Sequence, residues 1–118
     1  MIDMFLDYLK LERNYSPMTV ISYRKDLEAF ERFCQELDPQ ITWESVDTDV
    51  VRNWMEDMMD KGNAASSVNR RISALRSFYR FALRCGLVSK DPVHGLQGPR
   101  RQKPLPQFLK ESEMEQLL

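Results

Sequence analysis

Apolar residues recur every three or four positions along four stretches of this chain, and this spacing predicts amphipathic helices. The predicted helices cover residues 2–13, 17–37, 49–60 and 65–85. Residues 108–118 begin a further helical pattern, whereas 41–47 is too short and irregular to predict a strand. The expected fold class is all-α, a small orthogonal bundle of four to five helices. The side chains expected in its core are Ile2, Phe5, Leu6, Leu9, Val20, Tyr23, Leu27, Phe30, Cys34, Leu37, Val50, Val51, Trp54, Met55, Met58, Met59, Val68, Ile72, Leu75, Phe78, Tyr79, Ala82 and Leu83.

Capping residues mark several ends of these helices. Ser16 precedes a proline, so its hydroxyl can accept a bond from a free amide while the proline has no N–H to leave unpaired. Thr48 is expected to cap the third helix in the same way. Gly62 and Gly86 follow the third and fourth helices, where glycine commonly ends a helix.

The stretch 65–85 combines its apolar face with a cationic one. At about 100° per residue, Asn69, Ser73, Arg76, Arg80 and Arg84 fall together, with no acid among them. Arginines three or four residues apart often form only a solvated helix face. A second observation is therefore needed before this face is treated as a binding surface.

The distribution of charge supplies that observation. The 118 residues carry a formal net charge of −1, but residues 24–60 hold four Lys/Arg against eleven Asp/Glu. Residues 61–103 hold ten Lys/Arg against a single acid, Asp91. A basic segment this depleted of acids predicts contact with a polyanion, with the acidic segment facing away.

Composition excludes several other classes. No run approaches the roughly 20 apolar residues of a membrane span, and the N-terminus lacks a basic region before its apolar residues. We therefore expect a cytoplasmic protein with no membrane partner. Cys34 and Cys85 lack the spacing of a metal or redox pair and are expected to be reduced packing residues, and His94 has no cluster of ligands around it. We expect no metal, no cofactor and no small-molecule substrate, and no catalytic residues in this chain alone, because no nucleophile is paired with a base.

Three segments resemble the tyrosine recombinase, or phage-integrase, family. Residues 19–27 (TVISYRKDL), followed by Phe30 and Phe33, are similar to its T-x-x-x-Y-x-x-D-L-x-x-F-x-x-F helix. Residues 67–82 (SVNRRISALRSFYRFA) are similar to its S/T-x-N-R-x-L-S-A-L-R-x-F-Y-x-F pattern. Residues 103–118 resemble the linker and opening helix of its catalytic domain. The three lie in the family's order and spacing, and Xer-type recombinases are the nearest members in character.

The resemblance implies a SAM-like core-binding domain over residues 1–90, a basic Pro/Gly linker over 91–107 and the start of a catalytic domain over 108–118. Such a domain lies on one face of duplex DNA while the catalytic domain closes from the other. In the family, the helices corresponding to 17–37 and 65–85 enter the major groove, and the first helix contacts a neighbouring subunit in a tetramer. The tyrosine nucleophile and its assisting residues would follow residue 118.

These arguments predict duplex DNA as the partner and a specific set of contacts. The cationic side chains expected to hold phosphates are Arg70, Arg76, Arg80, Arg84 and Lys25. The polar side chains expected to reach base edges or phosphates are Ser22, Ser66, Asn69 and Ser73, and the linker adds Arg100, Arg101 and Lys103. Arg71 lies nearer the apolar stripe and is expected to pair with an acid of a neighbouring helix.

Two departures and two alternatives accompany this prediction. Where the family has Ser-Pro, this chain has alanines at 64–65, so Asn63 or Ser66 is expected to cap the fourth helix. One alternative is a protein-interaction module that docks an acidic partner through the arginine face and an exposed Phe81. The other is a helix-turn-helix regulator, which fits less well because Gly62 joins two long helices. Lys110 stands where the family usually has a capping Thr or Ser.

Overall fold

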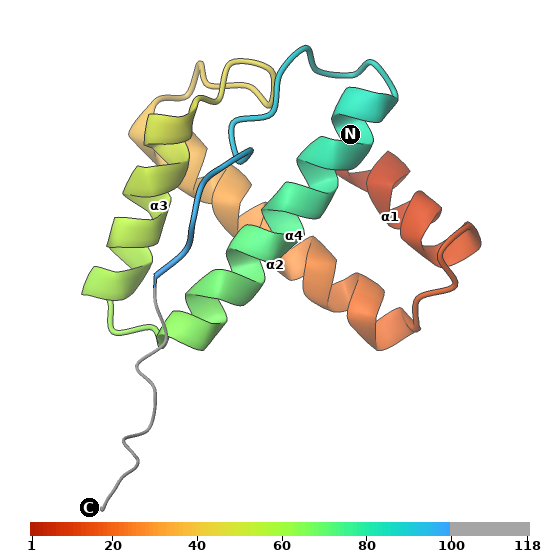
Figure 1. Ribbon diagram of the computed structural model, residues 1–118, viewed down its shortest axis with the longest axis horizontal. Helices are drawn as coiled ribbons and strands as arrows, with labels where there is room; N and C mark the ends of the chain where they lie inside the picture. The colour runs from red at the N-terminus through yellow and green to blue at the C-terminus, as the bar shows by residue number, and fades with distance from the viewer. Residues whose placement is uncertain (100–118) are drawn as a thin grey trace, which may run out of the picture.

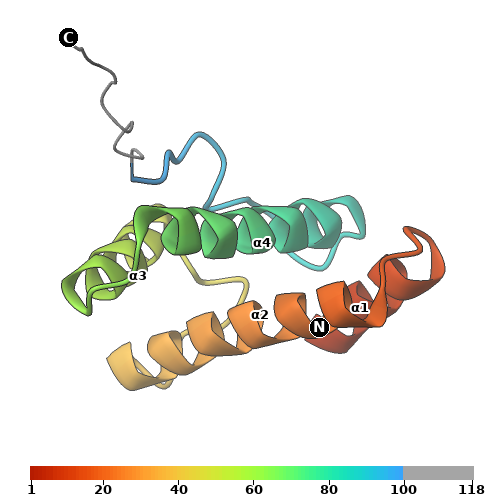
Figure 2. The same cartoon turned by 90° about the horizontal axis from the view of Figure 1, so that it is seen from below.

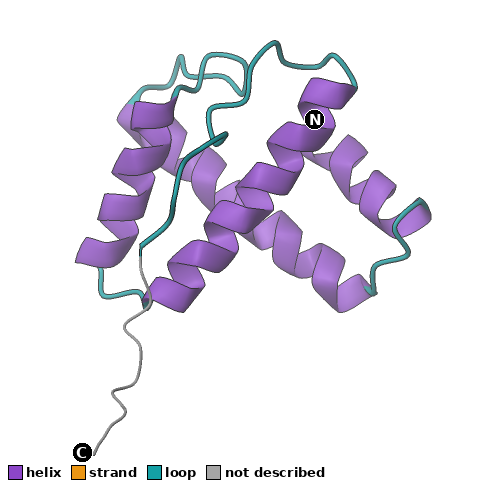
Figure 3. Ribbon diagram, viewed as in Figure 1, coloured by secondary structure: helices purple, strands orange, loops and turns teal. Residues whose placement is uncertain are grey.

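The structure of the protein, a computed structural model, describes residues 1–99 and contains four helices in that range (Figure 1). They are α1 (Ile2–Leu11), α2 (Pro17–Leu37), α3 (Thr48–Asp60) and α4 (Ala65–Arg84). The described residues outside these helices form turns and loops, with no strand among them (Figure 3). The all-α prediction is confirmed, whereas the helix predicted within 108–118 lies outside the described residues.

The four helices pack around α4. This helix contacts each of the other three, and it crosses α2 in a separate layer (Figure 1, Figure 2). α1 packs on both α2 and α4, while α3 packs on α4 and α2. Within residues 1–99, no helix is both long enough and apolar enough to span a membrane.

The core follows the predicted apolar spacing through the middle of each helix. Phe30, Val51, Val68 and Leu75 are fully buried, and Tyr79 is buried with its hydroxyl donating to the carbonyl oxygen of Trp43 at 2.7 Å. A buried hydroxyl needs such a partner, because an unpaired one would cost its full desolvation energy.

Three residues predicted to lie in the core, each near the end of a helix, are exposed. Leu37, Met59 and Leu83 are 50%, 43% and 43% exposed, because each lies in the last turn of its helix, where no neighbouring helix covers that side. Phe81, in contrast, is buried at 7% exposure, with its ring centroid 4.9 Å from that of Tyr8. The expected exposed Phe81 is therefore wrong, and the interaction-module alternative loses its apolar anchor.

Of the three N-caps predicted from the sequence, those of α2, α3 and α4, one agrees with the structure. Ser16 accepts a hydrogen bond from the backbone N–H of Thr19, as predicted for α2. At α3 the cap is Asp47, one residue before the predicted one, and Thr48 instead donates its hydroxyl proton to the carbonyl of Pro92. At α4, Ala64 occupies the N-cap and no side chain caps the helix.

The two substitute caps proposed for α4 are therefore wrong. The side-chain amide of Asn63 donates to the carbonyl oxygen of Met58 at 3.0 Å, so it closes the end of α3. Ser66 lies inside the first turn of α4. A residue at that position cannot accept from the first free amides as an N-cap does.

The segment after α4 runs back along that helix (Figure 1). Val88, Val93 and Leu96 are buried members of the core cluster. The linker predicted from residue 91 onward thus begins with residues that pack against the bundle. Its apolar residues follow turns and have no helical period, which is why the sequence pattern did not place them in the core.

Candidate nucleic-acid interface

A groove of about 360 Å³ lies between the N-terminal half of α2 and the N-terminal half of α4. We call it the α2–α4 groove, and its lining residues are Met18, Thr19, Ser22, Tyr23, Asp26, Arg70, Ser73 and Ala74. Three of the predicted site residues, Ser22, Arg70 and Ser73, are thereby brought together from two helices. The groove lies between two helices that cross, and the small side chains of Ser22, Ser73 and Ala74 form part of its lining.

A buried carboxylate lies at the base of the groove. Asp26 is 5% exposed, and its Oδ1 accepts a hydrogen bond from the Arg70 guanidinium at 3.0 Å. The Arg71 Nε atom lies 3.7 Å from the same oxygen, so the pairing predicted for Arg71 is confirmed. That nitrogen is buried and has no hydrogen-bond partner in the described part of the chain. Asp26 therefore joins α2 to two adjacent arginines of α4.

Arg70 was predicted only as a phosphate contact, and its pairing with Asp26 was missed. Its side chain is still 57% exposed. Because a guanidinium has five N–H donors, Arg70 can bond Asp26 and still donate to an acceptor in the groove. In the sequence, Asp26 stands directly before Leu27, which belongs to the apolar stripe of α2. An acid buried at that position needs a partner of opposite charge.

Asn69 and Arg76 face the segment that returns along α4. The Asn69 side-chain amide donates to the carbonyl of Pro99, and Arg76 donates to the carbonyl of Leu96, both at 2.8 Å. Both acceptors are uncharged carbonyl oxygens, so the positive charge of Arg76 is not neutralised by these bonds. Their contact with DNA stays a prediction, since both also fix the path of residues 96–99.

The other predicted contacts lie on exposed surface. Ser66, Ser73, Arg80 and Arg84 are exposed along α4, and Lys25 is exposed on α2. Arg76, Arg80 and Arg84 form no ion pair with any residue in the range 1–99, whereas Arg70 and Arg71 pair with Asp26. The C-terminal half of α4 therefore keeps its positive charge. Arg100, Arg101 and Lys103 lie outside the described residues.

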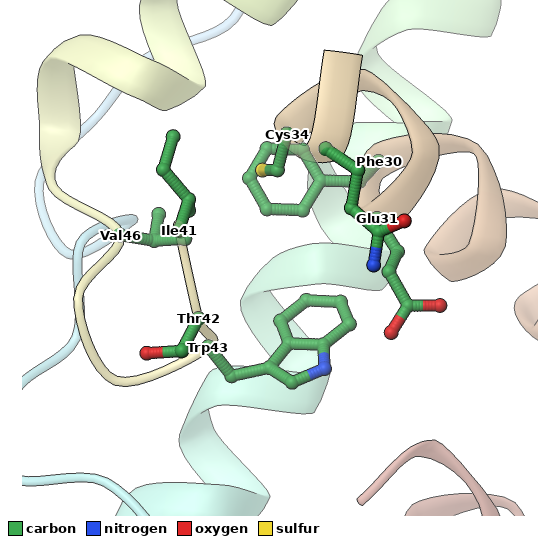
Figure 4. Close-up of a pocket in the computed structure, with 8 residues that line it drawn as sticks. Phe30, Glu31, Cys34, Ile41, Thr42, Trp43 and Val46 are labelled. Carbon is green, nitrogen blue, oxygen red and sulfur yellow. The ribbon is translucent and has the colours of Figure 1, made fainter. Parts of the chain in front are cut away.

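A second pocket, on another side of α2, is apolar (Figure 4). It encloses about 200 Å³ between α2 and the loop that follows it, and its lining includes Phe30, Cys34 and Trp43. Burial, followed by the charge of Glu31, raises the pKa of the Cys34 thiol to about 11. This thiol is therefore protonated at neutral pH and is a poor nucleophile or metal ligand. Across residues 1–99, no group of His, Cys, Asp and Glu is arranged to hold a metal ion.

Comparison with known proteins gives a consistent result. A model of the family described as phage integrase, N-terminal SAM-like domain, matches residues 2–86. Tyrosine recombinase XerC of Lactobacillus delbrueckii subsp. bulgaricus is 40% identical over 116 residues, which are 98% of this chain and 39% of that protein. Tyrosine recombinase XerC of Bacillus licheniformis is 37% identical, with 98% of this chain and 38% of that protein covered. The chain thus spans about two fifths of the length of these curated relatives.

A solved structure shares the fold. The crystal structure of a lambda integrase(75-356) dimer bound to a COC' core site superposes with a TM-score of 0.71 at 20% sequence identity. The match covers 86% of this chain and 34% of that one. At this identity the likeness establishes the arrangement of helices.

Proposed function

This chain belongs to the family of phage integrase N-terminal SAM-like domains, and on that premise we propose that it binds duplex DNA as the core-binding domain of a site-specific tyrosine recombinase. Its role is to position the duplex for strand cleavage and rejoining by a catalytic domain. The relatives carry the name tyrosine recombinase and are more than twice as long as this chain, which leaves room for that domain. The structural neighbour is described as bound to a COC' core site.

The observation that carries the proposal is the charge along the groove side of α4. Arg80 and Arg84 are exposed and have no acidic partner among residues 1–99, and Arg70 projects into the α2–α4 groove beside Ser22. The major groove of B-DNA is about 12 Å wide and admits an α-helix. A helix that enters it brings its flanking cations close to the phosphates on both sides.

The proposed contacts divide into two kinds. Lys25, Arg80 and Arg84 hold phosphates and set the register of the domain on the duplex, because they are long, cationic and exposed. Ser22 and Ser73 are short and lie within the groove, so they reach base edges or nearby phosphates. In the whole recombinase, neighbouring subunits on DNA complete the assembly as a tetramer that holds two sites.

Titration of this chain against a fluorescent duplex at several salt concentrations tests the proposal. Each phosphate contact contributes about 0.9 to the slope of log K against log[salt], so Arg80→Gln should flatten the slope by about that amount. Arg52→Gln is the matched control, because Arg52 is an exposed arginine of α3 that pairs with Asp49. Absence of binding at low salt, or equal slopes for the two variants, would contradict the proposal.

A further inference from the structure

A small cationic pocket lies between α1 and α4, beside the α2–α4 groove. We call it the α1–α4 pocket, and its polar lining consists of Tyr8, Arg13, Tyr15, Tyr23, Ser77, Arg80 and Arg84. Its volume is about 60 Å³. A pocket of this size and lining suits a compact anion.

Three guanidinium groups converge on this pocket without an acid. No carboxylate lines it, and none of Arg13, Arg80 and Arg84 forms an ion pair with a residue in the described range. Some other arginines in the same range are paired with acids, as Arg24 is with Asp3 and Glu28. An anion placed among the three guanidinium groups would be attracted by all of them.

Aromatic rings hold two of these arginines in place. The Arg13 guanidinium lies over the Tyr15 ring at 5.3 Å and donates to the Tyr15 hydroxyl at 3.2 Å. The Arg84 guanidinium lies over the Tyr8 ring at 5.2 Å. A guanidinium has five N–H donors, so these contacts leave donors of each arginine available. Both arginines are therefore oriented and still able to bind.

The backbone turn before α2 also contributes to this arrangement. Asn14 adopts a φ of 54°, in the left-handed region that asparagine tolerates better than most residues. The turn is fixed by hydrogen bonds from the Arg13 and Tyr15 backbone amides to α1, to the carbonyls of Tyr8 and Leu9. Arg13 and Tyr15 are thus returned toward the pocket. In agreement with a positive potential there, Arg13, followed by Arg84, lowers the pKa of the Tyr8 phenol.

The pocket adjoins the α2–α4 groove through one shared lining residue. Tyr23 lines both, and Ser77 of the pocket lies one helical turn beyond Ser73 of the groove. Arg70 and Arg84 mark the two ends of this run, about 21 Å apart along α4 at 1.5 Å per residue. That length exceeds the ~12 Å width of the major groove, so an α4 lying across the groove would bring its far end to a flanking backbone.

We propose that the α1–α4 pocket binds one backbone phosphate of the duplex held in the α2–α4 groove, with Arg13 and Arg84 as its principal donors. This inference rests on the proposed function and adds α1 and the turn after it to the DNA-binding surface. Guanidinium forks bind phosphate oxygens through paired hydrogen bonds, and the Ser77 hydroxyl supplies a further donor.

The test compares Arg13→Gln, Arg13→Lys and the control Arg52→Gln in the salt titration of the 118-residue chain. Arg13→Gln should flatten the slope by about 0.9 and weaken binding, whereas Arg52→Gln should change neither. Arg13→Lys keeps the positive charge, so the salt slope should be unchanged. Its affinity for DNA should fall, because an ammonium group cannot form the paired hydrogen bonds of a guanidinium. Arg13 is exposed, and thermal unfolding should show that all three variants are folded.

A second arm identifies the source of the phosphate. Inorganic pyrophosphate alone, titrated into the isotope-labelled chain, should shift the Nε–H signals of Arg13 and Arg84 with lower affinity than the duplex, and Arg13→Gln should abolish the shift at Arg84. Wild-type binding to DNA with an unchanged slope in Arg13→Gln would overturn this inference and leave the proposed function intact. Tight pyrophosphate binding with that unchanged slope would identify a free phosphate compound as the ligand instead. No wild-type binding to DNA would overturn both proposals.

Discussion

Asp26 provides the sharpest test of how α2 and α4 are held together. Replacing it with asparagine keeps the shape of the side chain and removes the charge. The Arg70 pair is solvent-exposed on one side, so its loss alone should cost at most about 1 kcal/mol. The larger effect comes from Arg71, because its buried Nε has the Asp26 carboxylate as its nearby counter-charge at 3.7 Å.

The expected total follows from the burial of these groups. Leaving a buried polar or charged group without its partner costs about 1–3 kcal/mol. The upper range of about 3–5 kcal/mol for a broken buried ion pair does not apply, because the Arg71 side chain is 29% exposed. We expect Asp26→Asn to lower the free energy of unfolding by about 2 kcal/mol. In a domain of about 100 residues this is a fall in Tm of about 8–16 °C.

Urea denaturation followed by circular dichroism measures this change, and a double-mutant cycle assigns it. Asp26→Asn combined with Arg71→Gln should show a larger coupling energy than Asp26→Asn combined with Arg70→Gln. A loss of stability below about 0.5 kcal/mol, the usual scatter for surface changes, would refute the reasoning. So would a larger coupling for Arg70, since the exposed pair would then be the stronger one.

Two further predictions concern helix caps and cysteines. Ser16→Ala should lower the free energy of unfolding by about 1 kcal/mol, because α2 would lose its side-chain cap. Ala64→Ser should raise the free energy of unfolding by about 0.5–1 kcal/mol, because α4 would gain a side-chain cap. Equal urea midpoints for both variants and the wild type would contradict this. Exposed Cys85 should react with a thiol reagent at pH 8 while buried Cys34 stays protected. Because the pKa of Cys34 rises from 9.0 to about 11, the folded state binds more protons than the unfolded state between these values, so stability should fall as pH rises from 9 to 11. Cys34→Ala should reduce this alkaline loss, and an unchanged profile would contradict the argument.

The helices themselves could be predicted from the sequence because their period repeats over many residues. Val68, Ile72, Leu75 and Tyr79 are four consecutive members of one stripe, and all are buried as expected. A single residue at a helix end carries no such redundancy. Leu83 fits the same stripe but is exposed, since its burial depends on whether another element reaches that far.

The candidate site was predictable in its residue types and less so in its partners. The acid-free face of α4 follows from local spacing, but the pairing of Arg70 with Asp26 joins residues 44 positions apart in the sequence. The bonds of Asn69 and Arg76 depend on the path of residues 96–99, which follow turns with no period. The α1–α4 pocket needs the turn at Asn14, and no pattern of apolar residues indicates it.

The returning segment after α4 changes the geometry available to anything joined to this bundle. Three hydrogen bonds hold residues 87–99 against the rest of the domain: Ser89 donates to Glu44, the Pro92 carbonyl accepts from Thr48, and the Pro99 carbonyl accepts from Asn69. A free tether of those thirteen residues could extend about 45 Å. Because these hydrogen bonds hold residues 87–99 in place, the reach of any domain joined after them would be counted from Pro99, beside the first turns of α4. A shorter tether would confine such a domain to a smaller volume and so raise its local concentration over the α2–α4 groove.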